Sequence, residues 1–229
     1  MYPTPPRLLI SASIRAAVCR ELDRVLPDEG LVVPLLAAQR RRPLRDPCAP
    51  IALAHLQRLV IARAVLIPAE LQVNTFARVS VLPSTDALVD QQIAAVIHRH
   101  PALRACAYLH SHPFARGWTR PSRGLRGDVE GHMLPLLARN QEAGLNAAFS
   151  FIACRGAAHR GVSNDWLLHG FALVEAATGH HRLVDLGLAQ PVSDDCAAVQ
   201  RALLPPLSRR EPWRFLLRRW RRELRRRGL

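Results

Sequence analysis

The chain has 229 residues, of which 49% are apolar and 22% are charged, and this balance excludes a wholly disordered protein. Its length predicts one compact domain with an extension, or two small domains, and a chain of this size folds without needing a disulfide or a metal. The formal net charge is +14, and because the sequence contains no lysine, all 32 basic residues are arginines. Such a balance predicts attraction to nucleic acid, anionic membranes or acidic proteins, and it says nothing about the fold.

The cysteines and the apolar segments indicate the cellular compartment. Five cysteines are scattered without a C-x-x-C pair, which argues against a disulfide framework and against a zinc site built from cysteines. Arg15 interrupts the apolar stretch near the N-terminus, which makes a poor signal peptide. No apolar run approaches the ~20 residues that span a bilayer. We therefore expect a cytoplasmic protein without a transmembrane segment.

Hydrophobic spacing in the first part of the chain predicts a helix followed by strands. Apolar residues at steps of three to five predict a helix over residues 8–26, which Pro27 ends. Residues 29–37 predict a short buried strand, in which Pro34 favours an edge position or a bulge. Two further strands are predicted at residues 58–67 and 71–82.

The second part of the chain alternates between helical and extended patterns. The predicted elements are a helix at 86–98, a strand at 103–109, a loop to about residue 127, a helix at 128–140 and strands at 147–154 and 167–176. This order predicts an α/β (α+β) fold with a mixed central sheet flanked by helices. We assign residues 1–187 to this domain and residues 188–229 to a C-terminal extension.

Two H-x-H pairs occur, His98-Arg99-His100 and His110-Ser111-His112. The first lies at the end of a predicted helix, where residues two apart point in different directions. The second lies at the end of a predicted strand, where residues two apart share a face. Only the second pair can direct both imidazoles at one metal ion.

A metal site in a hydrolase needs a third protein ligand and an open position for water. Asp128 is the candidate, because it follows the polar loop and begins the next predicted helix. The same position suits an N-cap, a role in which aspartate is favoured. Position alone leaves both roles open.

These motifs resemble the signature of the JAMM (JAB/MPN-type) metalloprotease family over roughly residues 8–180. The family pattern is a glutamate, then H-[ST]-H-P, then S-x-x-D, and the order of the intervening elements also matches. The chain resembles bacterial members, which look like peptidases that process or deconjugate ubiquitin-like modifiers. The corresponding pieces here are Pro27-Asp28-Glu29, His110-Ser111-His112-Pro113, Ser122 and Asp128. Glu21 is a rival for the glutamate, but it falls inside the predicted first helix.

The resemblance implies a JAMM/MPN-like core, related to the cytidine-deaminase-like fold, and a zinc-dependent reaction. His110, His112 and Asp128 would hold Zn²⁺, and Glu29 would take a proton from water and deliver it to the leaving amine. Ser122 would donate a hydrogen bond to the tetrahedral oxyanion. The expected reaction is hydrolysis of a peptide or isopeptide bond. The implied partners are a ubiquitin-like protein or its conjugate, together with E1-like or E2-like proteins.

The sequence departs from the family pattern in two places. Ser122 precedes Asp128 by six residues instead of three, and Leu125 stands where the family has its serine. Val32 stands where the family has a glycine, whereas Gly30 directly follows Glu29. The changed spacing motivates an alternative function, a catalytically inactive scaffold with a JAMM-like fold.

The C-terminal residues form a separate motif. Trp213, Leu217, Trp220 and Leu224 recur at helical spacing among arginines, which predicts a basic amphipathic helix at about 212–229. Such a helix could dock on its own domain or on a partner, or lie on a membrane surface. A further alternative is a nucleic-acid-associated protein, in which the phosphate contacts come from Arg218, Arg221, Arg222 and Arg225.

Overall fold

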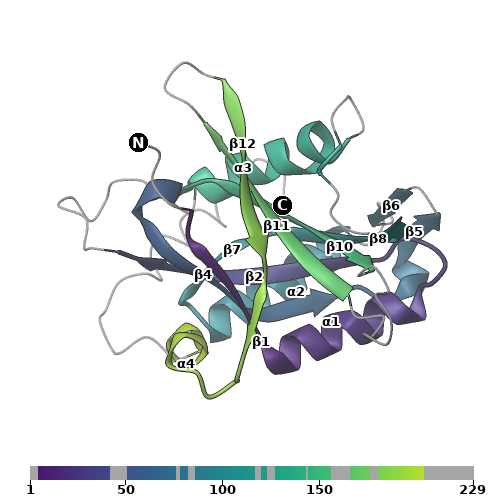
Figure 1. Ribbon diagram of the computed structural model, residues 1–229, viewed down its shortest axis with the longest axis horizontal. Helices are drawn as coiled ribbons and strands as arrows, with labels where there is room; N and C mark the ends of the chain where they lie inside the picture. The colour runs from purple at the N-terminus through teal and green to yellow at the C-terminus, as the bar shows by residue number, and fades with distance from the viewer. Residues whose placement is uncertain are drawn as a thin grey trace.

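The computed structural model describes residues 5–41, 51–75, 78–81, 86–116, 120–122, 127–142, 144–155, 166–175 and 180–203. Figure 1 shows how their helices and strands are arranged. In chain order they are β1 (Arg7–Ser11), α1 (Ala12–Arg24), β2 (Leu31–Arg40), β3 (Ile51–Ala52), η1 (Leu53–His55), β4 (Leu56–Leu66), η2 (Ala69–Leu71), β5 (Gln72–Thr75), β6 (Arg78–Val81), α2 (Asp86–Arg99), β7 (Leu103–Cys106), β8 (Tyr108–Arg116), η4 (Asp128–Met133), α3 (Leu134–Glu142), β9 (Leu145–Asn146), β10 (Ala148–Arg155), β11 (Trp166–Glu175), β12 (His181–Leu188), β13 (Gln190–Val192) and α4 (Ala197–Leu203).

The centre of the molecule is a nine-stranded sheet in the order β12-β11-β10-β8-β2-β4-β1-β13, with β7 also paired to β2. Three neighbouring pairs are parallel, namely β8 with β10, β1 with β4 and β1 with β13, and the remaining pairs are antiparallel. Helices flank this sheet. The predicted fold class, a mixed sheet with helices around it, is confirmed.

The sheet is curled. Strands β12 and β13 lie at its two ends, yet only Ala189 separates them along the chain. In Figure 1 this continuous segment crosses in front of β1 on its way to α4. The curl brings β1 against β11 across the interior. The contact is close at Gly170, where an added Cβ would lie 2.5 Å from Leu8 Cδ2 and 3.0 Å from Phe151 Cε1. The bare backbone of Gly170 therefore allows the interior to close.

Helices cover both faces of the sheet. Helix α1 buries Val18 and Leu22 in the cluster that fills the curled face. Helices α2 and α4 pack on the other face, in a cluster that contains Val89 and Val199. The segment η4–α3 covers the same face further along, where its Val129, Met133, Leu136 and Leu137 meet Ile152 and Phe171.

Three predicted boundaries are wrong. Residues 8–11 belong to β1 and not to the first helix, because the run Leu8-Leu9-Ile10 is buried between β4 and β13. The predicted strand 71–82 is the hairpin of β5 and β6. The predicted strand 103–109 is divided at Ala107 into β7 and β8.

Pro34 lies in the central strand β2 and not at an edge. Its carbonyl accepts a hydrogen bond from Ala107 N at 2.9 Å. In an antiparallel ladder, the N–H and C=O of one residue point to the same neighbour. The N–H that proline lacks would therefore face Ala107, where β7 gives way to β8, and this break in the ladder tolerates the proline.

The described part of the predicted extension belongs to this fold. Strand β13 pairs with β1, and α4 buries Ala198, Val199 and Ala202. Arg218, Arg221, Arg222 and Arg225, and the whole predicted basic helix, lie outside the described residues. Among the described residues, no helix has both the length and the apolar character needed to cross a membrane.

Candidate metal centre

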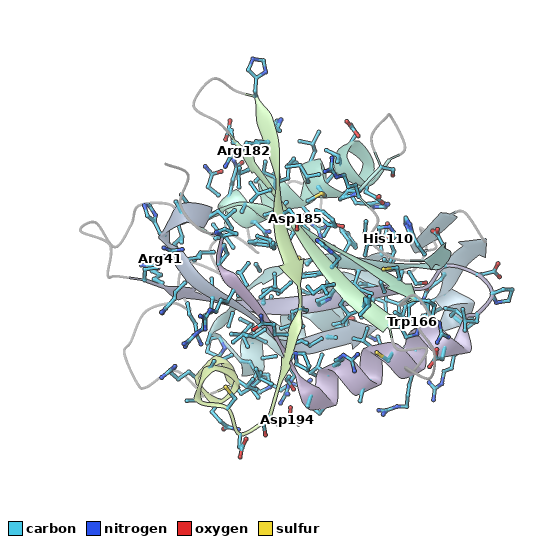
Figure 2. The ribbon with its side chains drawn as sticks, viewed as in Figure 1. Arg41, His110, Trp166, Arg182, Asp185 and Asp194 are labelled. Carbon is cyan, nitrogen blue, oxygen red and sulfur yellow. The ribbon has the colours of Figure 1, made fainter. Side chains whose placement is uncertain are left out.

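Strand β8 carries the two histidines of the second H-x-H pair. The imidazoles share one face of the strand, and their Nε2 atoms lie 2.9 Å apart. The side chain between them, Ser111, points to the opposite face and is fully buried. His110 is nearly buried, with 7% of its side chain exposed, whereas 26% of the His112 side chain remains accessible. Figure 2 shows His110 beside β8 and β10.

Asp128 brings a carboxylate to this pair of imidazoles. It is the first residue of η4, the π-helical turn that precedes α3, and its Oδ1 lies 3.3 Å from His110 Nε2. One ligand atom from each of His110, His112 and Asp128 lies within 4.8 Å of the others. These three side chains, called the metal triad below, form a largely buried group that could hold a metal ion.

Ser122 fixes the Asp128 carboxylate. The backbone N–H of Ser122 and its hydroxyl donate to Asp128 Oδ2 at 2.7 and 3.0 Å, and Asp128 N donates back to Ser122 Oγ at 3.0 Å. The N-cap residue of η4 is Gly127, and the Ser122 hydroxyl accepts the hydrogen bond from the first N–H of this helix. Asp128 is therefore no N-cap: one carboxylate oxygen faces the imidazoles while the other is held by Ser122.

Burial keeps the two imidazoles neutral, which is the form that binds a metal. Desolvation lowers the pKa of His110 from 6.5 to about 4, against the opposing effect of the Asp128 carboxylate. Desolvation also lowers the pKa of His112, again opposed by Asp128.

Glu29 adds a second carboxylate next to the metal triad. It precedes β2, and its Oε1 lies 4.0 Å from His112 Nε2, with 11% of the side chain exposed. Burial, together with the smaller effect of the negative charge of Asp128, raises its pKa from 4.5 to about 7. A carboxyl with this pKa can both accept and return a proton near neutral pH.

The other candidates from the sequence lie elsewhere. Glu21 sits on α1 and pairs with Arg24 at 3.0 Å. His98 is exposed near the end of α2, and His100, just after it, approaches Leu203 O at 3.3 Å. The rival glutamate and the first H-x-H pair are thus separate from the metal triad.

Ser111 and Gln72, two residues without a predicted role, hold the segment that carries Glu29. Ser111 Oγ accepts a hydrogen bond from Gly30 N at 2.7 Å. The Gln72 carboxamide accepts one from Leu31 N at 2.9 Å. Neither contact has a sequence signal, because each depends on which strands lie side by side.

The chemistry of the donor set fits a divalent transition metal. Two imidazoles and one carboxylate leave open positions at zinc in hydrolases, and the same set binds Fe(II) in oxygenases. Comparison of the sequence with protein-family models and with curated proteins gives no match.

Proposed function

We propose that this protein is a zinc-dependent peptidase or isopeptidase of the JAMM type. The observation that carries the proposal is the position of Glu29, whose Oε1 lies 4.0 Å from His112 Nε2 beside the buried metal triad. A carboxylate with a pKa near 7 serves hydrolysis as a general base. It has no comparable use in oxygen activation, so Glu29 favours zinc over iron as the cofactor.

The proposed zinc ion and the side chains of the protein would contribute different parts of the chemistry. Zinc held by His110, His112 and Asp128 would act as a Lewis acid that lowers the pKa of water to ~7. Glu29 would accept a proton from the water that attacks the carbonyl carbon of the scissile amide. The same carboxyl then delivers the proton to the leaving nitrogen as the C–N bond breaks. The products are a carboxylate and an amine.

Ser122 also contacts Asp128, which adds a positioning part to the one that the resemblance implies. Its hydroxyl donates to Asp128 Oδ2 at 3.0 Å and accepts from Asp128 N at the same distance. These contacts orient a ligand of the proposed zinc, as outer-sphere partners of metal ligands commonly do. Donation to the oxyanion stays a prediction, for which the hydroxyl would have to leave Asp128.

The order of elements around the site supports the JAMM-like core within this proposal. Helix α1 precedes Glu29, strand β2 follows it, and β8 delivers the histidines before the segment that ends at Asp128. The family's substrates make a ubiquitin-like protein or its conjugate the proposed substrate, with E1-like or E2-like proteins as partners.

The test combines metal analysis with cleavage. The full-length protein is loaded with zinc and incubated with a ubiquitin-like protein that carries a C-terminal peptide extension, and separately with an isopeptide-linked conjugate. We expect one zinc per chain and release of the extension or of the conjugated amine. Glu29→Gln should bind the same amount of zinc and lose turnover.

Glu21→Gln is the matched control, because it makes the same chemical change on α1 at a carboxylate that pairs with Arg24 and is not part of the metal triad. It should cleave like the wild type. Stoichiometric zinc without cleavage of either substrate would favour the inactive scaffold, and normal turnover by Glu29→Gln would refute the role of Glu29.

A further inference from the structure

The pairing of β2 with both neighbouring strands ends close to its first residue, Leu31. On one side, β4 pairs with β2 as far as Val32, opposite Leu66, and the chain then turns away toward η2. On the other side, the last paired residue is Leu31, opposite His110. The buried peptide groups of Gly30 and Leu31 therefore need other hydrogen-bond partners.

Gln72 supplies these partners on the β4 side. Its Oε1 accepts a hydrogen bond from Leu31 N at 2.9 Å, and its Nε2 donates to Leu31 O at 3.3 Å. The same Nε2 donates to Ile67 O at 2.5 Å. The buried carboxamide thus acts as a substitute peptide group, with a donor and an acceptor placed as in a strand.

Ser111 completes the ladder on the β8 side. A hydrogen-bonded antiparallel pair normally exchanges two backbone hydrogen bonds. Here Ser111 N donates to Gly30 O at 2.9 Å, but Gly30 N donates to the Ser111 hydroxyl at 2.7 Å. Gly30 is also confined from the α1 side, since an added Cβ would lie 2.5 Å from Val25 Cγ2.

We propose that Gln72 and Ser111 are positioning residues that act together on the segment Glu29–Leu31. Neither touches the metal triad through its polar group. Their hydrogen bonds hold the peptide groups directly after Glu29, and so hold the Glu29 carboxylate 4.0 Å from His112 Nε2. The inference rests on the proposed function, because that function gives Glu29 its part in proton transfer.

Gln72 is also the first residue of the β5–β6 hairpin. The hairpin and the segment that carries Glu29 are therefore joined through one side chain. A displacement of the hairpin would be transmitted to the proposed general base.

The test removes the carboxamide and keeps the length of the side chain. Gln72→Met loses three side-chain hydrogen bonds while it retains an apolar stem of similar size. Gln39→Met is the matched control: Gln39 lies near the other end of β2, and its Nε2 donates to Ala198 O at 3.0 Å. Both variants are made in the full chain.

The first measurement is amide hydrogen exchange by NMR on zinc-free protein, which does not depend on catalysis. We expect the Leu31 amide to exchange about tenfold faster or more in Gln72→Met, and at the wild-type rate in Gln39→Met. The second measurement uses zinc-loaded protein and the extended ubiquitin-like substrate. Gln72→Met should keep its zinc, lose about tenfold or more in kcat and keep KM within about twofold, whereas Gln39→Met should match the wild type.

Ser111 keeps the inference testable if Gln72→Met does not fold. Ser111→Ala should expose the Gly30 amide to exchange and lower kcat with zinc retained. Ser111→Thr restores the hydroxyl and should recover most of both effects.

The outcomes separate the two proposals. Faster exchange together with lower kcat supports the inference. Unchanged exchange, or unchanged kcat in an active enzyme despite faster exchange, overturns it. A wild-type chain that binds zinc and cleaves neither substrate overturns the proposed function. In that case, amide exchange alone decides whether Gln72 and Ser111 hold the segment Glu29–Leu31 in place.

Discussion

Replacing Glu29 by glutamine should stabilise the metal-free protein, and the gain should depend on pH. Burial and the nearby Asp128 charge raise the pKa of Glu29 from 4.5 to about 7 in the folded state. A group with a raised folded-state pKa stabilises the fold below its unfolded pKa and loses that contribution as the pH rises through the folded value. The wild type therefore loses stability between about pH 4.5 and 7, and Glu29→Gln does not.

The structure sets the size of this difference. A rise in pKa from 4.5 to about 7 corresponds to at most about 3 kcal/mol between the ionised and protonated carboxyl. The side chain is 11% exposed, so water screens part of the charge. We expect Glu29→Gln to gain about 2 kcal/mol over the wild type at pH 8, and just under ~1 kcal/mol at pH 5.

Urea unfolding of the zinc-free proteins at pH 5 and pH 8 measures both values. Glu21→Gln serves again as the control. Its free energy of unfolding at pH 8 should not rise above that of the wild type as that of Glu29→Gln does. Equal stability differences for Glu29→Gln at the two pH values would refute the reasoning, since they would show that the Glu29 carboxyl ionises in the folded protein as easily as in the unfolded chain.

Three further outcomes follow from the site. The kcat/KM of the zinc enzyme should fall as the pH is lowered, because Glu29 becomes protonated and can no longer accept a proton; a profile that stays flat at acidic pH would contradict this assignment. Asp128→Asn should weaken zinc binding by about tenfold or more in a chelator competition, and a change below about twofold would exclude Asp128 as a ligand. Gly30→Ala should lower the free energy of unfolding by about 1–3 kcal/mol in a thermal melt, because its Cβ would lie 2.5 Å from Val25 Cγ2; an unchanged melting temperature would show that α1 shifts freely.

The fold class could be predicted because most elements have clear periodicity. Strand β1 could not, since a short apolar run such as Leu8-Leu9-Ile10 fits a buried strand or a helix equally well. Its assignment depends on β13, which pairs with it from the other end of the described chain. The hairpin at 72–81 was predicted as one strand because alternation continues through both of its arms.

The metal triad was within reach of sequence reasoning because its members follow local rules. His110 and His112 share a face whenever their segment is a strand, and Asp128 stands at a predicted helix start. The contacts that position Glu29 follow no local rule. A lone glutamine at position 72 acquires its role only when β2 and β4 lie side by side and β4 ends one residue too early to pair with Leu31.

The pairing of β1 with β13 has a consequence for biosynthesis. Residues 7–11 are synthesised well before residues 190–192, and one edge of their strand is not covered until the later residues have been made, when Leu9 meets Gln190. Contacts between such distant residues slow folding, because a long loop must close before they form. The nascent chain therefore exposes an apolar strand edge while the residues between β1 and β13 are made, and such an exposed edge favours aggregation.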